Sequence, residues 1–260
     1  MILALDVGNT NIVLGCMEGT EIRQTFRVAT DRLRTEYEYA VAFDSQLRFC
    51  GVDPKNFSGA ILSSVVPPLT NVLSRAVAKA TGVRPLIVGA GVKTGVNILL
   101  DDPAEAGSDL IVAAAAALRL YKPPLALIDM GTATTISVLD KNGSFRGGPI
   151  VPGVQLSLDA LTARTSLLPK IPLEAPERCI GTNTVDSMKS GSVLGAASML
   201  DGMLDRIEDE LGMKVTAVAT GGIASSIVPY CRHSVVLNDD LLLYGLAVIY
   251  EKNGRREHAD

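Results

Sequence analysis

Short apolar runs separated by polar turns occupy two stretches of this chain, one at its beginning and one near its middle. Runs of this length, bounded by Gly, Asn, Asp or Glu, are typical of β-strands joined by tight turns. Strands are predicted at residues 2–5, 12–14 and 22–28 in the first stretch and at residues 125–128, 136–139 and 144–150 in the second. Because both stretches show the same succession of runs and turns, the sequence predicts an internal duplication.

Longer segments with an apolar face predict helices between and after these strands. One begins at the capping box Thr35-Glu-Tyr-Glu38, and the longest runs from Thr184 to Leu211. Further helices are predicted up to residue 81, over 109–120 and up to 161, and further strands at 60–66, 85–88 and 215–219. Alternating strands and helices indicate an α/β protein. The break at Lys122-Pro123-Pro124 predicts two domains, 1–121 and 122–260.

The turn between the first two strands has a similar composition in both copies. Its sequence is Asp6-Val-Gly8-Asn9-Thr10-Asn11 in the first copy and Asp129-Met-Gly131-Thr132-Ala133-Thr134 in the second. Glycine lets the backbone approach a ligand closely, and Asn and Thr add short donors beside the backbone N–H groups, which suits phosphate oxygens. An aspartate before such a turn would repel a bare phosphate, so it indicates a cation between the two. Two such turns facing each other across a cleft would hold a nucleoside triphosphate and its metal, although ordinary hairpin turns favour the same residues.

Composition narrows the class of protein. A chain of 260 residues with 47% hydrophobic residues is long enough for two domains with cores of their own. A net charge of −4 argues against nucleic acid as the main partner, and no apolar stretch approaches the roughly 20 residues of a membrane span. We therefore expect a soluble, cytoplasmic protein. The four cysteines are widely spaced and there are two histidines, which favours reduced thiols over a disulfide framework or a zinc site.

Two weaker patterns lie in the second half. Thr220-Gly221-Gly222 follows a predicted strand and precedes a helix, so it is a candidate contact for a nucleotide or a plain turn. The longest predicted helix carries a stripe of small residues that would let another helix approach closely, either within the chain or from a second subunit. This stripe consists of Gly191, Gly195, Ser198 and Gly202.

Six motifs, in order along residues 1 to about 250, resemble those of type III pantothenate kinases. They are Asp6-Val-Gly-Asn-Thr10, Gly107-Ser-Asp109, Asp129-Met-Gly-Thr-Ala-Thr-Thr135, Gly147-Gly148 with Pro152-Gly153, Gly181-Thr-Asn-Thr184 and Thr220-Gly-Gly222. That family belongs to the superfamily of actin, hexokinase and heat-shock chaperones. The resemblance implies two duplicated ribonuclease-H-like domains of the actin-like ATPase fold, with a nucleotide cleft between them.

The resemblance also implies an activity, which is the ATP-dependent phosphorylation of pantothenate to 4'-phosphopantothenate, the first step of coenzyme A biosynthesis. It implies a homodimer that uses Mg²⁺ and a monovalent cation, K⁺ or NH₄⁺, with ATP as co-substrate. The ATP contacts carried over are Asp6, Gly8, Asn9, Thr10, Asn11, Gly131, Thr132, Thr220, Gly221 and Gly222. Asp6 would bind Mg²⁺ and Asp129 the monovalent cation. Asp109 matches the general base. The acceptor contacts carried over are Gly107, Ser108, Leu110, Leu100 and Thr184, the last contributed at the subunit interface.

The chain departs from the family pattern at two acceptor positions. Leu110 stands where an arginine is expected to pair with the pantothenate carboxylate, and Leu100 stands where a tyrosine is often found. Loss of one charge-assisted hydrogen bond to a carboxylate ordinarily costs about 1.5–3 kcal/mol. Arg164 and Lys189 are the cations that we expect to compensate.

Alternatives stay open at this point. Asp109 precedes an apolar helix and has the sequence of an N-terminal cap as well as that of a base. The whole chain also fits a kinase of the same superfamily acting on another small hydroxy acid or sugar, or a non-catalytic regulator that binds nucleotide or coenzyme A. The intact phosphate motifs and Asp109 favour a kinase.

Overall fold

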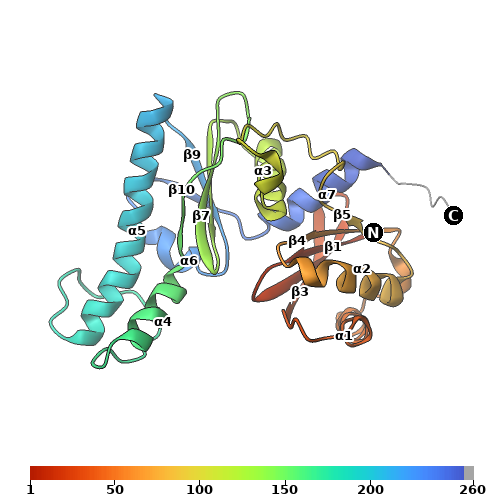
Figure 1. Cartoon of the computed structure of the whole chain (residues 1–260), viewed down its shortest axis with the longest axis horizontal. Coiled ribbons are helices and arrows are strands. Elements are labelled where there is room, and N and C mark those ends of the chain that lie inside the picture. The colour runs from red at the N-terminus through yellow and green to blue at the C-terminus, as the bar shows by residue number, and fades with distance from the viewer. Residues whose placement is uncertain (255–260) are drawn as a thin grey trace. The chain divides into compact units, whose positions relative to one another are not determined.

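The computed structural model describes residues 1–254, which divide into two compact units (Figure 1). Unit 1 contains residues 1–96, 102–119 and the segment that begins at Asp240, and unit 2 contains residues 97–101 and 120–239. The units differ from the predicted domains 1–121 and 122–260 in the last helix, which belongs to unit 1. None of the helices in the described part of the chain has the length and hydropathy that crossing a membrane requires.

Each unit is built around a five-stranded mixed sheet. The strands of unit 1 are β1 (Ile2–Val7), β2 (Asn11–Glu18), β3 (Glu21–Ala29), β4 (Gly59–Ser64) and β5 (Leu86–Ile87). Those of unit 2 are β6 (Leu125–Met130), β7 (Ala133–Leu139), β8 (Ile150–Pro152), β9 (Thr216–Thr220) and β10 (Val235–Leu237). The strand orders are β3-β2-β1-β4-β5 and β8-β7-β6-β9-β10, so the second sheet repeats the first. The predicted duplication is confirmed.

One predicted strand was placed wrongly. Residues 144–150 were expected to form the third strand of the second copy, but β8 covers only Ile150–Pro152. Gly147 and Gly148 have φ values of 83° and 152°, which bend the chain out of the extended conformation. Phe145 instead forms isolated bridges with Ile98 and Leu139.

The helices follow the predicted pattern closely. They are α1 (Glu36–Phe49), α2 (Pro67–Thr81), α3 (Ser108–Leu120), α4 (Val154–Arg164), α5 (Thr184–Leu211), α6 (Ala224–Ile227) and α7 (Leu241–Asn253), with short 3₁₀ turns η1 (Pro54–Asn56), η2 (Pro103–Glu105) and η3 (Val228–Tyr230). The capping box at Thr35 is confirmed, since its hydroxyl accepts from the Glu38 N–H and the Glu38 carboxylate accepts from the Thr35 N–H. The helix from Thr184 to Leu211 is also confirmed.

Strand alternation gives the first sheet two buried faces. Leu3 and Leu5 of β1 pack in the same core as α1 and α2, whereas Ala4 packs in the core that contains residues of α3 and α7. Figure 1 shows α1 and α2 side by side on the first of these faces. The second sheet packs its Ala126 and Ile128 against the long helix α5. The central strands β1 and β6 are therefore each packed against helices.

Helix α7 approaches α3 unusually closely. A Cβ atom added at Gly245 would overlap the backbone carbonyl of Val112, so only glycine permits this crossing. Since α3 begins at Ser108, this contact helps to fix the helix that carries Asp109.

We expect Gly245→Ala to destabilise the protein by about 1–3 kcal/mol, because the methyl group forces α7 away from α3. Urea unfolding of the full chain measures this. The matched control is Gly89→Ala, because that exposed glycine has nothing within 4 Å of an added Cβ among the described residues. This control is expected to change the free energy of unfolding by no more than about 0.5 kcal/mol, as surface substitutions that make no new contact usually do. Equal effects of the two substitutions would contradict the close crossing.

Candidate functional site

The first candidate phosphate loop, residues 8–11, joins β1 to β2. Its backbone is closed by a hydrogen bond from Gly8 N–H to the Asn11 carbonyl, 3.0 Å. Thr30, just after β3, donates its hydroxyl to the Gly8 carbonyl (2.7 Å) and its N–H to the Thr10 carbonyl (2.9 Å). The carbonyls of Gly8, Thr10 and Asn11 thus accept hydrogen bonds from residues of unit 1. Residues 9–11 at the tip of the loop are exposed to solvent.

Parallel pairing brings Asp109 to the same edge of the first sheet. β1 and β4 are parallel, with Asp6 in register with Ser63. The buried Ser63 hydroxyl lies 2.9 Å from the Ser108 hydroxyl, which also donates to the Ser64 carbonyl at 3.2 Å. These contacts tether the N-terminus of α3 to the carboxyl end of β4. Asp6, the first loop and Asp109 therefore belong to one edge of one sheet.

Asp109 lies in the first turn of α3 rather than before the helix. Its Oδ1 accepts a hydrogen bond from the Leu110 N–H at 2.8 Å, while the Gly107 carbonyl accepts from the Ile111 N–H. A Cβ at Gly107 would lie only 2.5 Å from that Oδ1, so glycine makes room for the carboxylate. Burial raises the pKa of Asp109, and the hydrogen bond from the Leu110 N–H opposes the rise. The carboxylate thus accepts a hydrogen bond at the helix terminus and is also partly desolvated.

The second candidate phosphate loop, residues 131–133, joins β6 to β7. Gly131 N–H donates to the Ala133 carbonyl at 3.0 Å, as Gly8 does to Asn11 in the first loop. The loop is one residue shorter, because Met130 pairs with Thr134 whereas Val7 pairs with Ile12. Gly153, which precedes α4, donates its N–H to the Thr132 carbonyl at 3.0 Å. A Cβ at Gly153 would overlap the carbonyls of the loop, so this glycine supports its shape.

The Thr220–Gly222 turn lies beside the second loop. β9 is parallel to β6, and Asp129 is in register with Thr220. Gly221 has a φ of 100°, and a Cβ there would lie 2.6 Å from the Met130 backbone. The helix predicted after this turn is the short α6. The predicted ATP contacts therefore fall into two groups, one at a sheet edge of each unit.

The predicted acceptor residues are also divided between the units. Gly107, Ser108 and Leu110 lie with Asp109 in unit 1. In unit 2, Leu100 packs beside Gly147, with a methyl carbon 3.0 Å from the place of a Cβ on that glycine. Thr184, the first residue of α5, lines a mainly apolar cavity of about 870 Å³. This cavity lies between α4 and the first half of α5, lined also by Val151, Leu158, Leu161, Met188 and Met199.

The small-residue stripe of α5 does not serve packing within unit 2. Gly191, Gly195 and Ser198 are exposed. Among the described residues, nothing lies within 4 Å of a Cβ added at either glycine. The structure thus contradicts internal packing as the reason for the stripe. Glycine destabilises the middle of a helix, and here no neighbouring element within the described part of the unit requires the space that it leaves.

The two candidate cations differ in their surroundings. Lys189 donates to the Glu174 carboxylate at 2.6 Å, and this hydrogen bond raises the pKa of the lysine. Arg164 is exposed at the end of α4, and within the described part of the chain its guanidinium makes no hydrogen bond or ion pair. Arg164 is therefore the freer of the two for an anionic ligand.

Sequence reasoning missed the residues that support the first loop. Arg32 donates to the Asn9 side chain at 3.0 Å, and Thr30 bonds the loop backbone. Ser63 was treated only as part of a buried strand, although a polar residue inside an apolar run is a signal of a specific partner. Its partner Ser108 lies 45 residues away in the sequence, which no local pattern reveals.

Comparison with known proteins identifies the family. The family model for type III pantothenate kinase matches residues 2–206. The chain is 42% identical over 253 residues to the type III pantothenate kinase of Moorella thermoacetica, covering 97% of this chain and all of that protein. The chain belongs to the type III pantothenate kinase family. A second relative, the type III pantothenate kinase of a Geobacillus species, is 41% identical to the chain. That alignment covers 97% of this chain and 98% of the relative. Membership makes the protein an ATP-dependent kinase.

Solved structures support the fold of this type III pantothenate kinase family member. A Campylobacter jejuni protein described as a Baf family transcriptional activator aligns with a TM-score of 0.61 at 18% identity, covering 96% of this chain and 98% of that one. The activator of 2-hydroxyisocaproyl-CoA dehydratase from Clostridium difficile aligns with a TM-score of 0.55 at 12% identity, covering 97% and 93%. Together with the repeated strand order, these likenesses confirm the α/β fold of two duplicated, actin-like domains.

We expect Gly153→Ala to lower kcat/KM for ATP by about 10²-fold, because the new methyl group displaces the Gly131–Thr132 carbonyls and the loop with them. Steady-state kinetics at varied ATP measure this. Gly89→Ala is the control, since that exposed glycine has nothing near its added Cβ among the described residues. Kinetics unchanged in Gly153→Ala would show that the loop does not depend on this contact.

Proposed function

We propose that this protein transfers the γ-phosphoryl group of ATP to the primary hydroxyl of pantothenate, giving 4'-phosphopantothenate in the cytoplasm as the first step of coenzyme A biosynthesis. The observation that carries the proposal is the placement of the first candidate phosphate loop and the half-buried carboxylate of Asp109 at one edge of the first sheet. A phosphate cradle and a base are the two parts that phosphoryl transfer to an alcohol requires.

In this proposal, the predicted turns contact ATP. The phosphates are contacted by Gly8, Asn9, Thr10, Asn11, Gly131 and Thr132, and the adenosine is contacted by Thr220, Gly221 and Gly222. Backbone N–H groups and short hydroxyls stabilise phosphate charge without moving during the reaction.

Two aspartates are the proposed cation ligands. Asp6 binds Mg²⁺ directly or through water, and Asp129 binds K⁺ or NH₄⁺. The surroundings of Asp129 fit such an ion, because its cross-strand neighbour Thr135 has a buried hydroxyl without a hydrogen-bond partner among the described residues. Hydroxyl and carboxylate oxygens are the ligands that hard cations prefer. When bound, Mg²⁺ neutralises charge on the transferring phosphate.

Asp109 is the proposed general base. It accepts a hydrogen bond from the acceptor hydroxyl and takes its proton as the oxygen bonds to the γ-phosphorus and ADP departs. Gly107 and Ser108 hold the helix terminus and the carboxylate in place. The acceptor carboxylate pairs with Arg164, in place of the arginine that Leu110 replaces.

We also propose a homodimer in which Thr184 contacts the acceptor bound to the partner. The exposed small-residue stripe and the apolar cavity beside Thr184 support it, because among the described residues they leave one face of α5 exposed. Small residues allow two helix backbones to approach each other.

Asp109→Asn is the first test. We expect kcat with ATP, Mg²⁺ and pantothenate to fall by about 10²- to 10⁴-fold while ATP binding is retained, because asparagine keeps the shape and loses the base. Glu105→Gln, an exposed change four residues earlier, is the control and should leave kcat unchanged. Turnover retained in Asp109→Asn would remove this aspartate from the mechanism.

The same variant separates lost chemistry from damaged folding. The pKa of Asp109 is higher in the folded than in the unfolded chain, so its contribution to stability is largest below the unfolded pKa and is lost as pH rises through the folded pKa. Asp109→Asn should therefore be more stable than the parent at neutral pH, and the difference should shrink in acid. Thermal unfolding at several pH values measures this, and a variant less stable at neutral pH would contradict it.

Arg164→Ala is expected to raise KM for pantothenate by about 10- to 100-fold with little change in KM for ATP, since one charge-assisted contact is lost. Lys189→Ala is the comparison and should have a smaller effect, because Glu174 already pairs with that lysine. If neither variant changes KM for pantothenate, the result favours the alternative that the protein phosphorylates a different acceptor. In that alternative, the leucines at positions 100 and 110 reflect a different acceptor, another small hydroxy acid or a sugar, and substrate competition identifies it.

A further inference from the structure

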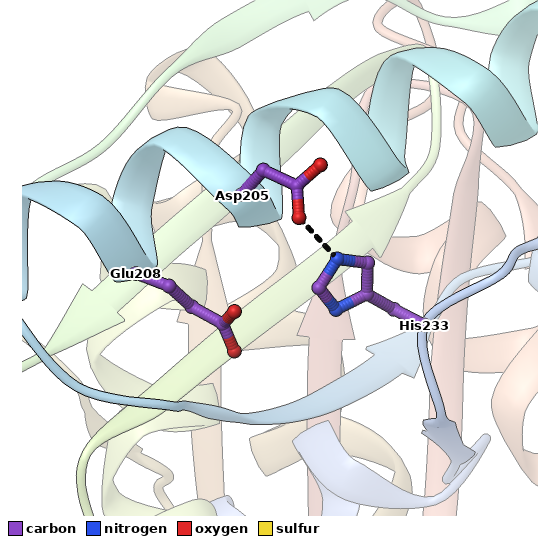
Figure 2. A group of neighbouring side chains, drawn as sticks. All are labelled: Asp205, Glu208 and His233. Atoms are coloured by element: carbon purple, nitrogen blue, oxygen red, sulfur yellow. Dashed lines mark hydrogen bonds and ion pairs between the residues drawn. The ribbon is translucent and has the colours of Figure 1, made fainter.

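A group of metal-binding side chains lies near the C-terminal end of α5, separate from all the residues proposed for catalysis. Asp205 and Glu208 are three residues apart on α5, so their side chains emerge on one side of the helix. His233 comes from the segment between η3 and β10. Figure 2 shows the imidazole between the helix and this segment, bonded to Asp205 at 2.8 Å from Nε2 to Oδ1. One ligand atom from each residue lies within 4.8 Å of the other two.

The two carboxylates of this group differ in exposure. The side chain of Glu208 is 8% exposed, and that of Asp205 is 64% exposed. Burial opposes ionisation of Glu208, but hydrogen bonds from the Lys214 ammonium (2.5 Å) and the Val215 N–H (3.1 Å) together keep its pKa below the usual value. The side chain of Lys214 is 83% exposed, so its ammonium group stays hydrated when it moves away from Glu208. Glu208 is thus an ionised, buried ligand whose present cation is replaceable.

The position of His233 is fixed by a second layer of contacts. The carboxylate of Asp201, one turn before Asp205 on α5, accepts hydrogen bonds from the backbone N–H groups of Arg232 (2.9 Å) and His233 (3.0 Å). Such outer contacts orient the ligands of metal sites. Cys231 does not take part, because its sulfur faces the Ala197 and Ile227 carbonyls and burial raises the pKa of its thiol to about 11.

We propose that Asp205, Glu208 and His233 bind a divalent transition-metal ion of the zinc class, with water completing the coordination. One imidazole nitrogen and two carboxylate oxygens form a donor set that suits Zn²⁺ and Co²⁺. Bonds of about 2.0–2.2 Å in a tetrahedron separate ligand atoms by about 3.4 Å, a spacing within the range observed here. The ion would displace Lys214 and join α5 to the segment before β10, stabilising unit 2. Widely spaced cysteines had argued against zinc, whereas the ligands here are carboxylates and an imidazole.

Cobalt titration of the full-length protein tests the proposal. Bound Co²⁺ is followed by its visible absorption, and thermal unfolding is measured with Zn²⁺ and with a chelator. We expect visible bands typical of four-coordinate Co²⁺ and a higher Tm with Zn²⁺. His233→Gln and Asp205→Asn should each weaken Co²⁺ binding at least tenfold. Lys214→Ala should strengthen it, because it removes the cation that competes for Glu208.

The second histidine provides the matched control. His258 lies outside the described residues, and His258→Ala should leave Co²⁺ binding unchanged. Absence of Co²⁺ binding, binding that persists in His233→Gln, or binding lost in His258→Ala would each overturn the proposal. None of these residues belongs to the proposed kinase machinery, so ATP-dependent turnover of the variants reports on the proposed function independently.

Discussion

Parallel pairing of two central strands is the constraint on which the arrangement of this protein depends. In each unit the strand that ends in the candidate phosphate loop, β1 or β6, lies parallel to the strand that follows a long connection, β4 or β9. Parallel strands place their carboxyl ends at one edge of a sheet, where ligands of open α/β sheets bind. The polar turns, the Ser63–Ser108 contact and the Thr220 turn all occur at such edges because of this pairing.

Partial burial of Asp109 shows how the fold raises the pKa of a carboxyl group at some expense of stability. Desolvation raises the pKa of its carboxyl, which makes the carboxylate a better proton acceptor. The same desolvation disfavours the ionised form in the folded state. The Leu110 N–H and the space left by Gly107 hold the carboxylate in one position despite that penalty. The conformation of residues 107–110 therefore determines both the pKa and the position of this carboxyl group.

Much of this architecture could be predicted from the sequence, because it depends on local patterns. The strand-turn-strand succession around Asp6 and Asp129 indicated the duplication, and the predicted helix from Thr184 to Leu211 matches the bounds of α5. Residues 144–150 were misassigned because alternation does not reveal the positive φ values of two glycines. The Ser63–Ser108 contact and the approach of His233 to α5 join residues far apart in the sequence, and such contacts leave no periodic trace.

The return of α7 to unit 1 has a consequence for how the protein is made. The core on one face of the first sheet contains Ala4 and Ile61 together with Leu243 and Leu246 of the last helix. When only residues 1–239 have left the ribosome, α7 has not yet been made. The face of the first sheet that carries Ala4 and Ile61 therefore still lacks its contacts with α7. The N-terminal unit is completed only after the C-terminal one has been synthesised. Loss of α7 would consequently damage the half that was translated first.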